Sequence, residues 1–252
     1  MIVLTAPAFT AAIKACTAVI ALQGTFPVLA VGPNPCPVQI DAQGATIAGM
    51  TFYASKHVMV TGGTFTAAKY ATVLLYGADD IRMIGGTYLQ PVSAGISVYK
   101  STNVVLEGNG FSDPIGDGID VASSQFVTVS HNRVARYSTA TIYHPDGIAI
   151  WSSPGLPMTA HVVVSDNLVV GHTQGVTAFN HSDQGMPGFD DVHFTRNISA
   201  VDMPQCVAMS APATNSDVTV NVCLTLLGAK WAAAVNVDPS IPQSGNVPGI
   251  RP

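Results

Sequence analysis

Short stretches of alternating apolar and polar residues recur along most of the chain. One such run, VMVTGG at residues 58–63, returns at positions 81, 104 and 127, and each interval is 23 residues. Later copies begin at positions 162, 192 and 218, so that the spacing lengthens to 35, 30 and 26 residues. Equal intervals followed by longer ones predict a repeated structural unit with loops inserted into its later copies.

One position inside each run is occupied almost always by Gly or Asn. It lies five residues after the start of the run, and Asn fills it in four successive copies. Asn tolerates left-handed backbone and its amide can bond to an identical neighbour, so this column predicts a ladder of stacked asparagines in a turn. The complete column is Gly63, Gly86, Asn109, Asn132, Asn167, Asn197 and Cys223.

A second alternating stretch follows each of these positions, as in GIDVA at 118–122 and GIAIW at 147–151. In the first of them Ile119 and Val121 share one face of a strand, and Asp120 lies on the other. Stacking such repeats pairs every strand in parallel with its equivalent in the next coil. We expect an all-β fold, a single-stranded right-handed parallel β-helix of about seven or eight coils.

The two ends of the chain differ from this repeat. Residues 7–16 (PAFTAAIKAC) have the pattern of a short amphipathic helix, which we expect to cap the open end of the stack. The coils should span residues 45–237, and the tail at 238–252 has no regular pattern. These segments together fit a single domain over residues 1–252.

The composition supports this fold and excludes several classes of protein. Of the 252 residues 48% are apolar and only 10% are charged, which argues against disorder and against helical bundles, whose exposed faces need Glu, Lys and Arg. A net charge of -5 without a basic stripe argues against nucleic acid as a partner. No apolar run reaches the roughly 18 residues of a membrane span, and no basic segment precedes an apolar stretch as in a signal peptide.

The four cysteines, Cys16, Cys36, Cys206 and Cys223, have neither CxxC nor CxxH spacing, which argues against a zinc site. We expect buried thiols, because a free cysteine packs as a small apolar side chain. A disulfide between Cys16 and Cys36 is the alternative.

The outward positions of the second strands carry a row of large aromatic side chains. Tyr76, Tyr99, Trp151 and Phe179 fill four of six equivalent positions in a chain that is only 7% aromatic. Rings about 5 Å apart form a flat strip on which sugar rings can stack. Two alternatives stay open, because inserted loops or a second subunit could cover the same rings.

Two carboxylates occupy equivalent positions in neighbouring coils, just before the Gly that opens each second strand. They are Asp117 and Asp146, and Asp120 lies close to them. Neighbouring carboxylates raise one another's pKa, so that one can stay protonated as an acid while another acts as a base. We expect no cofactor, although the three could instead bind Ca2+, and the simplest alternative is that they accept hydrogen bonds from turn amides.

These segments resemble the pectin-lyase-like β-helix superfamily. GDGID at 116–120 and HPDGIAI at 144–150 are similar to the NTDGID and DDCIAI signatures of polygalacturonase-type glycoside hydrolases, and phage tail-spike proteins share the fold. The resemblance covers residues 45–237 and assigns catalytic Asp residues to Asp117 and Asp146. Pro145 stands where the family has its middle Asp, and the family's GHG and RIK motifs are absent.

Other polar residues lie near the same predicted groove. His144, two residues before Asp146, is a candidate acid or base near neutral pH. Cations beside the groove could bind uronate carboxylates. The candidates for substrate contacts are Lys100, Arg133, Arg136, His172 and His181, together with the aromatic residues named above.

The combination of a repeated scaffold, an aromatic strip and grouped carboxylates predicts a protein that acts on polysaccharide. We expect a hydrolase or lyase that cleaves an acidic polysaccharide in a groove on the outer face of the coils. The alternatives are a non-enzymatic phage tail-spike or surface-fibre module and a carbohydrate-binding rod. We expect a monomer or a homotrimer that works outside the cell, on a cell surface or on a virion.

Overall fold

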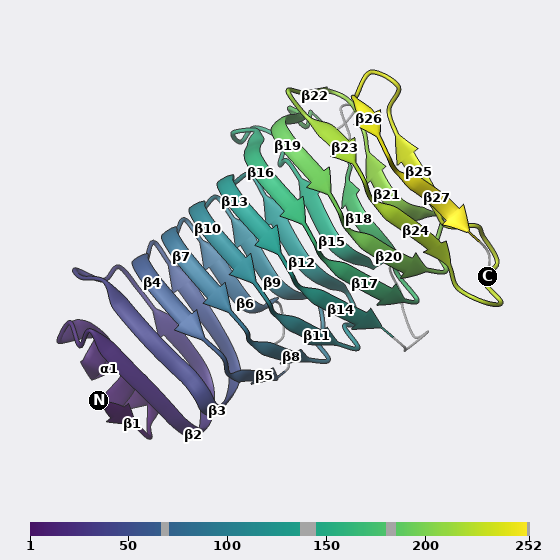
Figure 1. Cartoon of the computed structure of the whole chain (residues 1–252). Coiled ribbons are helices and arrows are strands. Elements are labelled where there is room, and N and C mark those ends of the chain that lie inside the picture. The colour runs from purple at the N-terminus through teal and green to yellow at the C-terminus, as the bar shows by residue number, and fades with distance from the viewer. Residues whose placement is uncertain (67–70, 137–144, 180–184, 251–252) are drawn as a thin grey trace.

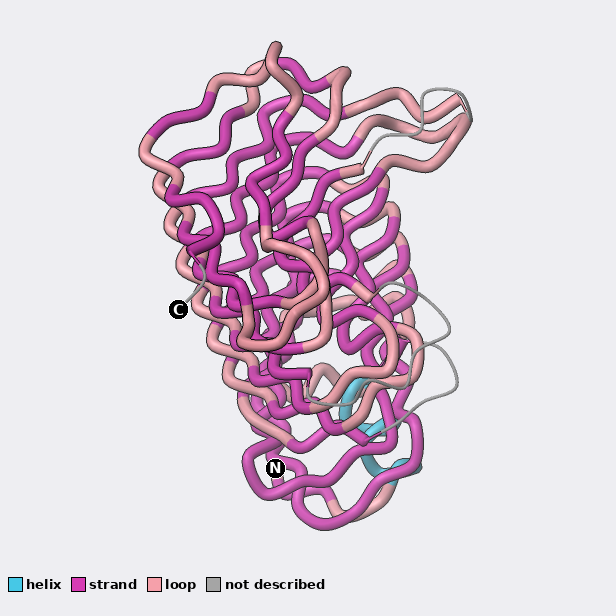
Figure 2. Tube along the Cα trace, turned by 90° about the vertical axis from the view of Figure 1, so that its right-hand side faces the viewer, coloured by secondary structure: helices cyan, strands magenta, loops and turns pink. Residues whose placement is uncertain are grey.

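The computed structural model describes residues 1–66, 71–136, 145–179 and 185–250, and within them the chain forms a rod of stacked coils (Figure 1). A repeating coil contributes strands to three faces, here called faces A, B and C, and strands of neighbouring coils pair in parallel. The view turned by 90° shows the trace winding repeatedly around the long axis (Figure 2). The prediction of an all-β parallel β-helix is therefore confirmed.

The strands of each face succeed one another along the rod. Face A consists of β4 (Lys56–Thr61), β7 (Asp79–Ile84), β10 (Thr102–Glu107), β13 (Gln125–Ser130), β16 (Thr159–Ser165), β19 (Phe189–Thr195), β22 (Ala213–Thr214), β23 (Asp217–Thr219) and β26 (Gln243–Ser244). Face B consists of β5 (Thr64–Thr66), β8 (Thr87–Leu89), β11 (Gly110–Ser112), β14 (Arg133–Arg136), β17 (Leu168–Gly171), β20 (Ile198–Val201), β24 (Val222–Thr225) and β27 (Val247–Ile250). Face C consists of β6 (Ala71–Tyr76), β9 (Ala94–Tyr99), β12 (Asp117–Ala122), β15 (Asp146–Trp151), β18 (Gln174–Ala178), β21 (Gln205–Met209) and β25 (Ala234–Val237).

The coils extend further toward both ends than predicted. At the N-terminus β1 (Ile2–Val3) and α1 (Ala6–Lys14) precede two long strands, β2 (Val19–Val31) and β3 (Val38–Tyr53). β3 belongs to all three faces, since it pairs in turn with β4, β5 and β6. Strands thus begin before residue 45, and the tail at 238–252, which lacked a regular pattern in the sequence, contains β26 and β27.

The N-terminal helix caps the stack as expected, although its bounds differ slightly from the predicted 7–16. The Thr5 side chain accepts a hydrogen bond from the Ala8 backbone N–H and so begins α1, with Pro7 in the first turn. Phe9, Ala12 and Ile13 are the buried residues of α1, which shields apolar residues that the first coil would expose. Among the described residues, no helix is long and apolar enough to cross a membrane.

The predicted asparagine ladder is present and longer than expected. The Asn109 backbone N–H donates to Oδ1 of Asn132 at 2.9 Å, and the same bond links each later member to the next. The register places Phe194 beside Val218, so the last copy of the repeat begins two residues before Val218, where the sequence had placed its start. Cys223 is therefore not in the column of Gly and Asn residues. The ladder consists of Asn109, Asn132, Asn167, Asn197, Asn221 and Asn246.

The left-handed backbone of this turn lies one residue before each Asn, not on the Asn as predicted. Gly108, His131 and Asp166 have φ angles of 65°, 57° and 58°. The Asn residues are therefore required for their amides, whose bonds continue from coil to coil, rather than for their tolerance of positive φ.

The prediction of buried thiols is wrong, because both pairs of cysteines form disulfides. Cys16 and Cys36, the pair foreseen as the alternative, link the end of α1 to the turn before β3 with a Cα–Cα distance of 5.7 Å. Cys206 and Cys223 have the same Cα–Cα separation of 5.7 Å and are completely buried. They come from β21 on face C and β24 on face B, whose inward side chains meet across the core.

Candidate functional site

Asp117 and Asp146 lie at the corner where the chain enters face C, and Asp120 follows Asp117 on β12. At this corner the coils approach each other so closely that only Gly fits after Asp117 and after Asp146. A Cβ atom on Gly118 would lie 2.5 Å from the Gly147 carbonyl oxygen, and one on Gly147 would lie 2.4 Å from Val169 Cγ1. The two Asp-Gly steps therefore fix Asp117 at the start of β12 and Asp146 at the start of β15, in adjacent coils.

Asp117 and Asp146 are side by side, as the repeat predicted. Oδ1 of Asp117 accepts a hydrogen bond of 2.6 Å from the Asp146 backbone N–H. Asp117 thus makes the bond to a turn amide that the simplest alternative expected. That alternative does not describe the other two aspartates, because Oδ1 of Asp120 and Oδ1 of Asp146 are buried without a hydrogen-bond partner among the residues that the structure describes.

The surroundings favour the protonated form of two of these carboxyl groups. Burial, followed by the charge of Asp117 and a side-chain hydrogen bond to it, raises the pKa of Asp120 well above its ordinary value. Burial and the charge of Asp117 likewise raise the pKa of Asp146. The corner therefore retains protons at a pH where an isolated Asp has lost its proton, which is the property required of a general acid.

A pocket of about 240 Å³ opens beside this corner. Asp117 and Asp146 line it, whereas Asp120 is not among its lining residues. Its other walls come from β15, β18 and the following loop, and they are mainly apolar and aromatic: Ala149, Ile150, Trp151, Thr177, Phe179 and Met186. A titratable pair in a largely apolar pocket is the usual form of an active site.

The predicted aromatic strip runs along face C and ends at this pocket. The rings of Tyr76 and Tyr99 have centroids 5.6 Å apart, and those of Tyr99 and Trp151 are 6.5 Å apart. Tyr53, which the sequence analysis missed, adds a ring stacked 5.4 Å from Tyr76. Phe179, the fourth predicted member, lines the pocket.

Of the predicted cations, Lys100 lies with the strip. Its Nζ is 5.3 Å from the ring centroid of Tyr99 and 5.9 Å from that of Tyr76. Arg133 is exposed on β14 of face B, and it is not among the residues that line the pocket.

The structure corrects the prediction for Arg136 and shows a bonding partner for His172. Arg136 is completely buried, and its guanidinium donates to the backbone carbonyls of Pro114 and His172 instead of facing a groove. His172 is half-buried, and its Nδ1 bonds to Oδ2 of Asp202 in the next coil. Both residues lie where the chain turns from face B to face C, and they hold that corner together.

The remaining predictions concern His144, His181 and the possible Ca2+ ion. His144 and His181 lie outside the described residues. Within the part of the chain that the structure describes, no group of three or more His, Cys, Asp or Glu side chains has the geometry of a metal site.

One residue of the strip and one of the pocket escaped the sequence analysis. Tyr53 precedes Tyr76 by one repeat of 23 residues and ends the stretch MTFY, so the same spacing would have revealed it. Met186 follows the inserted segment after Phe179, where no repeat pattern exists to place it.

Comparison with known proteins identifies the fold. The chain matches the family model of the right-handed β-helix region over residues 41–198, which is more than half of its length. A comparison with curated proteins finds no match.

Several solved structures resemble the whole rod at low sequence identity. A tailspike protein double mutant of E. coli bacteriophage HK620 has a TM-score of 0.57 and 11% identity, covering 98% of this chain and 61% of its own. PfbA, a surface adhesin of Streptococcus pneumoniae, has a TM-score of 0.53 and 9% identity, covering 90% and 83%. A polygalacturonase from Erwinia carotovora ssp. carotovora has a TM-score of 0.52 and 12% identity, covering 90% and 87%. At these identities the likeness shows a common fold alone.

Proposed function

Because the chain belongs to the family of right-handed β-helix proteins, we propose that it acts on polysaccharide and cleaves it in the pocket beside Asp117 and Asp146. The observation that carries the proposal is the pair of neighbouring carboxyls that line a pocket at the end of an aromatic strip. The resemblance in fold to a polygalacturonase supports the same class of substrate.

The two lining carboxyls divide the work of glycoside hydrolysis. Asp146 keeps its proton and gives it to the glycosidic oxygen as the C–O bond breaks. Asp117 is stabilised as the anion by the Asp146 backbone N–H and takes a proton from the attacking water. Asp120 does not line the pocket, and it acts through its hydrogen bond to Asp117 as a positioning residue.

The aromatic strip and Lys100 indicate the kind of substrate. Tyr76, Tyr99 and Trp151 form a row of aromatic rings that successive sugar residues can contact, and Lys100 beside them supplies a positive charge for a uronate carboxylate. We therefore propose an acidic polysaccharide. We propose hydrolysis rather than lyase chemistry, because the pocket is lined by two carboxyls that can serve as acid and base.

A carbohydrate-binding or surface-fibre role without cleavage is the second candidate. The observation that favours it is Pro145, which replaces the middle Asp of the polygalacturonase-type signature. The Pro145 carbonyl accepts hydrogen bonds from the Thr173 hydroxyl and the Gln174 backbone N–H, so this position serves the turn. The resemblance of the fold to a tailspike and to a surface adhesin supports the same alternative.

The test compares purified wild-type protein with Asp117→Asn and Asp146→Asn on a panel of acidic and neutral polysaccharides. Glu107→Gln is the matched control, since Glu107 is an exposed carboxylate on β10 of face A. We expect new reducing ends without ultraviolet-absorbing unsaturated products, and a loss of about a hundred-fold or more in both Asp variants. Cleavage at the wild-type rate by both Asp variants would contradict the assignment, and binding without any cleavage by wild type would favour the second candidate.

We also propose that the protein works outside the cell, on a cell surface or on a virion. The two disulfides support this location, because they persist in oxidising compartments. The similar adhesin and tailspike structures agree with it. A sedimentation measurement decides between the monomer and the homotrimer expected of fibre-like modules.

A further inference from the structure

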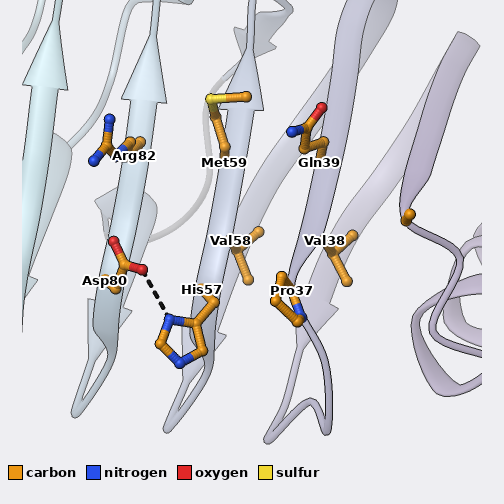
Figure 3. Close-up of a pocket in the computed structure, with 9 residues that line it drawn as sticks. Pro37, Val38, Gln39, His57, Val58, Met59, Asp80 and Arg82 are labelled. Atoms are coloured by element: carbon orange, nitrogen blue, oxygen red, sulfur yellow. Dashed lines mark hydrogen bonds and ion pairs between the residues drawn. The ribbon is translucent and has the colours of Figure 1, made fainter.

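A second concave surface lies on face A, away from the pocket of Asp117 and Asp146. It consists of two adjoining hollows of about 360 and 440 Å³, and both are lined by His57, Asp80 and Arg82. Figure 3 shows His57 and Asp80 pointing toward each other from adjacent strands, with Arg82 further along the strand of Asp80. The larger hollow continues over β10 and β13 and is also lined by Asp79, Asn103, Val105 and Phe126.

Phe126 provides an exposed aromatic wall in a fixed orientation. Its side chain is 52% exposed, and one face of its ring stacks on the His161 ring of the following coil at 4.5 Å and 13°. The other lining residues of the larger hollow all come from preceding coils. The free face of the Phe126 ring therefore borders the hollow, and the ring loses little freedom when a ligand stacks on it.

The polar residues opposite Phe126 are also held in place before any ligand arrives. Asn103 Nδ2 donates to Asp79 Oδ1 at 2.9 Å, and His57 Nδ1 lies 2.8 Å from Asp80 Oδ2. Arg82 is exposed and forms no ion pair within the part of the chain that the structure describes. Its guanidinium, together with the second oxygens of the carboxylates, can bond to a ligand.

We propose that the hollow bordered by Phe126 is a second carbohydrate-binding site, which takes a neutral pyranose residue and does not cleave it. An aromatic ring beside planar amide, carboxylate and guanidinium groups matches the two kinds of surface on a pyranose, its apolar ring face and its hydroxyls. Asp79 and Asp80 outnumber Arg82 in charge, so a uronate is disfavoured here. Asp80 is already paired with His57, and Asp79 accepts a hydrogen bond from Asn103, so each carboxylate is engaged by a neighbouring side chain.

To isolate this site, the experiment first removes two aromatic rings from the strip on face C. The parent protein carries Tyr99→Ala and Trp151→Ala, and calorimetric titration measures its binding of cello-, malto-, manno- and galactohexaose and of hexagalacturonate. We expect at least one neutral hexaose to bind and hexagalacturonate not to bind. Phe126→Ala should then weaken that binding about ten-fold or more, and Arg82→Ala should weaken it as well.

The matched control is Trp231→Ala, because Trp231 is an aromatic residue of similar exposure, 47%, that lies outside the hollow. It should leave the affinity unchanged, and urea unfolding checks that every variant is folded. The proposal is overturned if the parent binds none of the neutral hexaoses, or if Phe126→Ala and Arg82→Ala bind as the parent does. It does not depend on the chemistry proposed for face C, since loss of cleavage in Asp117→Asn leaves these titrations unaffected.

Discussion

The asparagine ladder should contribute strongly to the stability of the rod, and Asn167→Ala tests this at its centre. The Asn167 side chain is buried and forms five hydrogen bonds between 2.9 and 3.0 Å. Its Oδ1 accepts from the backbone N–H and the side-chain amide of Asn132, and its Nδ2 donates to Oδ1 of Asn197. Its other two bonds go to backbone carbonyls of Val129 and Ser165.

The size of the loss in stability depends on which hydrogen bonds the partners of Asn167 keep after the substitution. The Ser165 carbonyl still accepts from the His131 N–H at 3.2 Å, and Asn132 Nδ2 still donates to backbone carbonyls. The Asn132 backbone N–H has no other acceptor among the described residues, so truncation leaves a buried donor unsatisfied. An orphaned buried donor costs about 1–3 kcal/mol, and with the net loss of the other bonds we expect Asn167→Ala to lower the free energy of unfolding by about 3–5 kcal/mol.

Urea unfolding followed by far-ultraviolet circular dichroism measures this loss, with the slope of the transition as a check that the cooperative unit is unchanged. Gln243→Ala is the matched control, because Gln243 is an exposed amide side chain on β26, outside the ladder and at a position without positive φ. It should change the free energy of unfolding by no more than about 0.5 kcal/mol. A loss below about 1 kcal/mol in Asn167→Ala would refute the reasoning, since water would then satisfy the ladder as well as the amides do.

Three further predictions concern charge and packing. Burial and a neighbouring carboxylate raise the pKa of Asp120, so the wild-type fold loses stability as pH rises above the pKa of this residue in the unfolded chain. In urea unfolding, the stability of Asp120→Asn should therefore equal that of wild type near pH 3 and be higher than that of wild type at pH 7. Burial lowers the pKa of His193, but Asp191 and Asp217 raise it overall, so its stabilising effect is present below pH 6.5 and lost as pH rises through the folded value. His193→Gln should remove that part of the pH dependence. Gly147→Ala forces a Cβ against the adjoining coil and should cost about 1–3 kcal/mol, measured as a lower unfolding midpoint, whereas unchanged stability would show that the corner is loose.

The juxtaposition of Asp117 and Asp146 could be predicted although an insertion separates them in the chain. The Gly that follows each Asp and the alternating strand after it mark the same point in both coils, and the inserted loop does not disturb either signal. The same logic fails for Cys223, because VTVNVC contains apolar residues at both possible registers. Only the pairing of Phe194 with Val218 decides between the registers.

The orientation of side chains at the corners could not be predicted from the repeat. Strand alternation ends at a corner, so the rule that assigns inward and outward positions no longer applies. Arg136 is the last residue of β14, and it turns into the structure to bond backbone carbonyls. A nearby cation in the sequence is therefore weak evidence for a cation in the groove, and Lys100 is the one predicted contact of this charge that lies with the strip.

The exposed fractions of the rings along the aromatic strip indicate whether inserted loops cover it. Tyr53 is 58% exposed at its N-terminal end, whereas Tyr76, Tyr99 and Trp151 are half-buried. A strip covered by inserted loops for packing alone would be buried along its whole length, because an exposed tyrosine ring gains little from such a cover. Tyr53 is more exposed than the three inner rings, which fits an open surface that leads to the pocket of Asp117 and Asp146. Under the proposed function, a polymer would rest on the rings and reach the aspartates at one end.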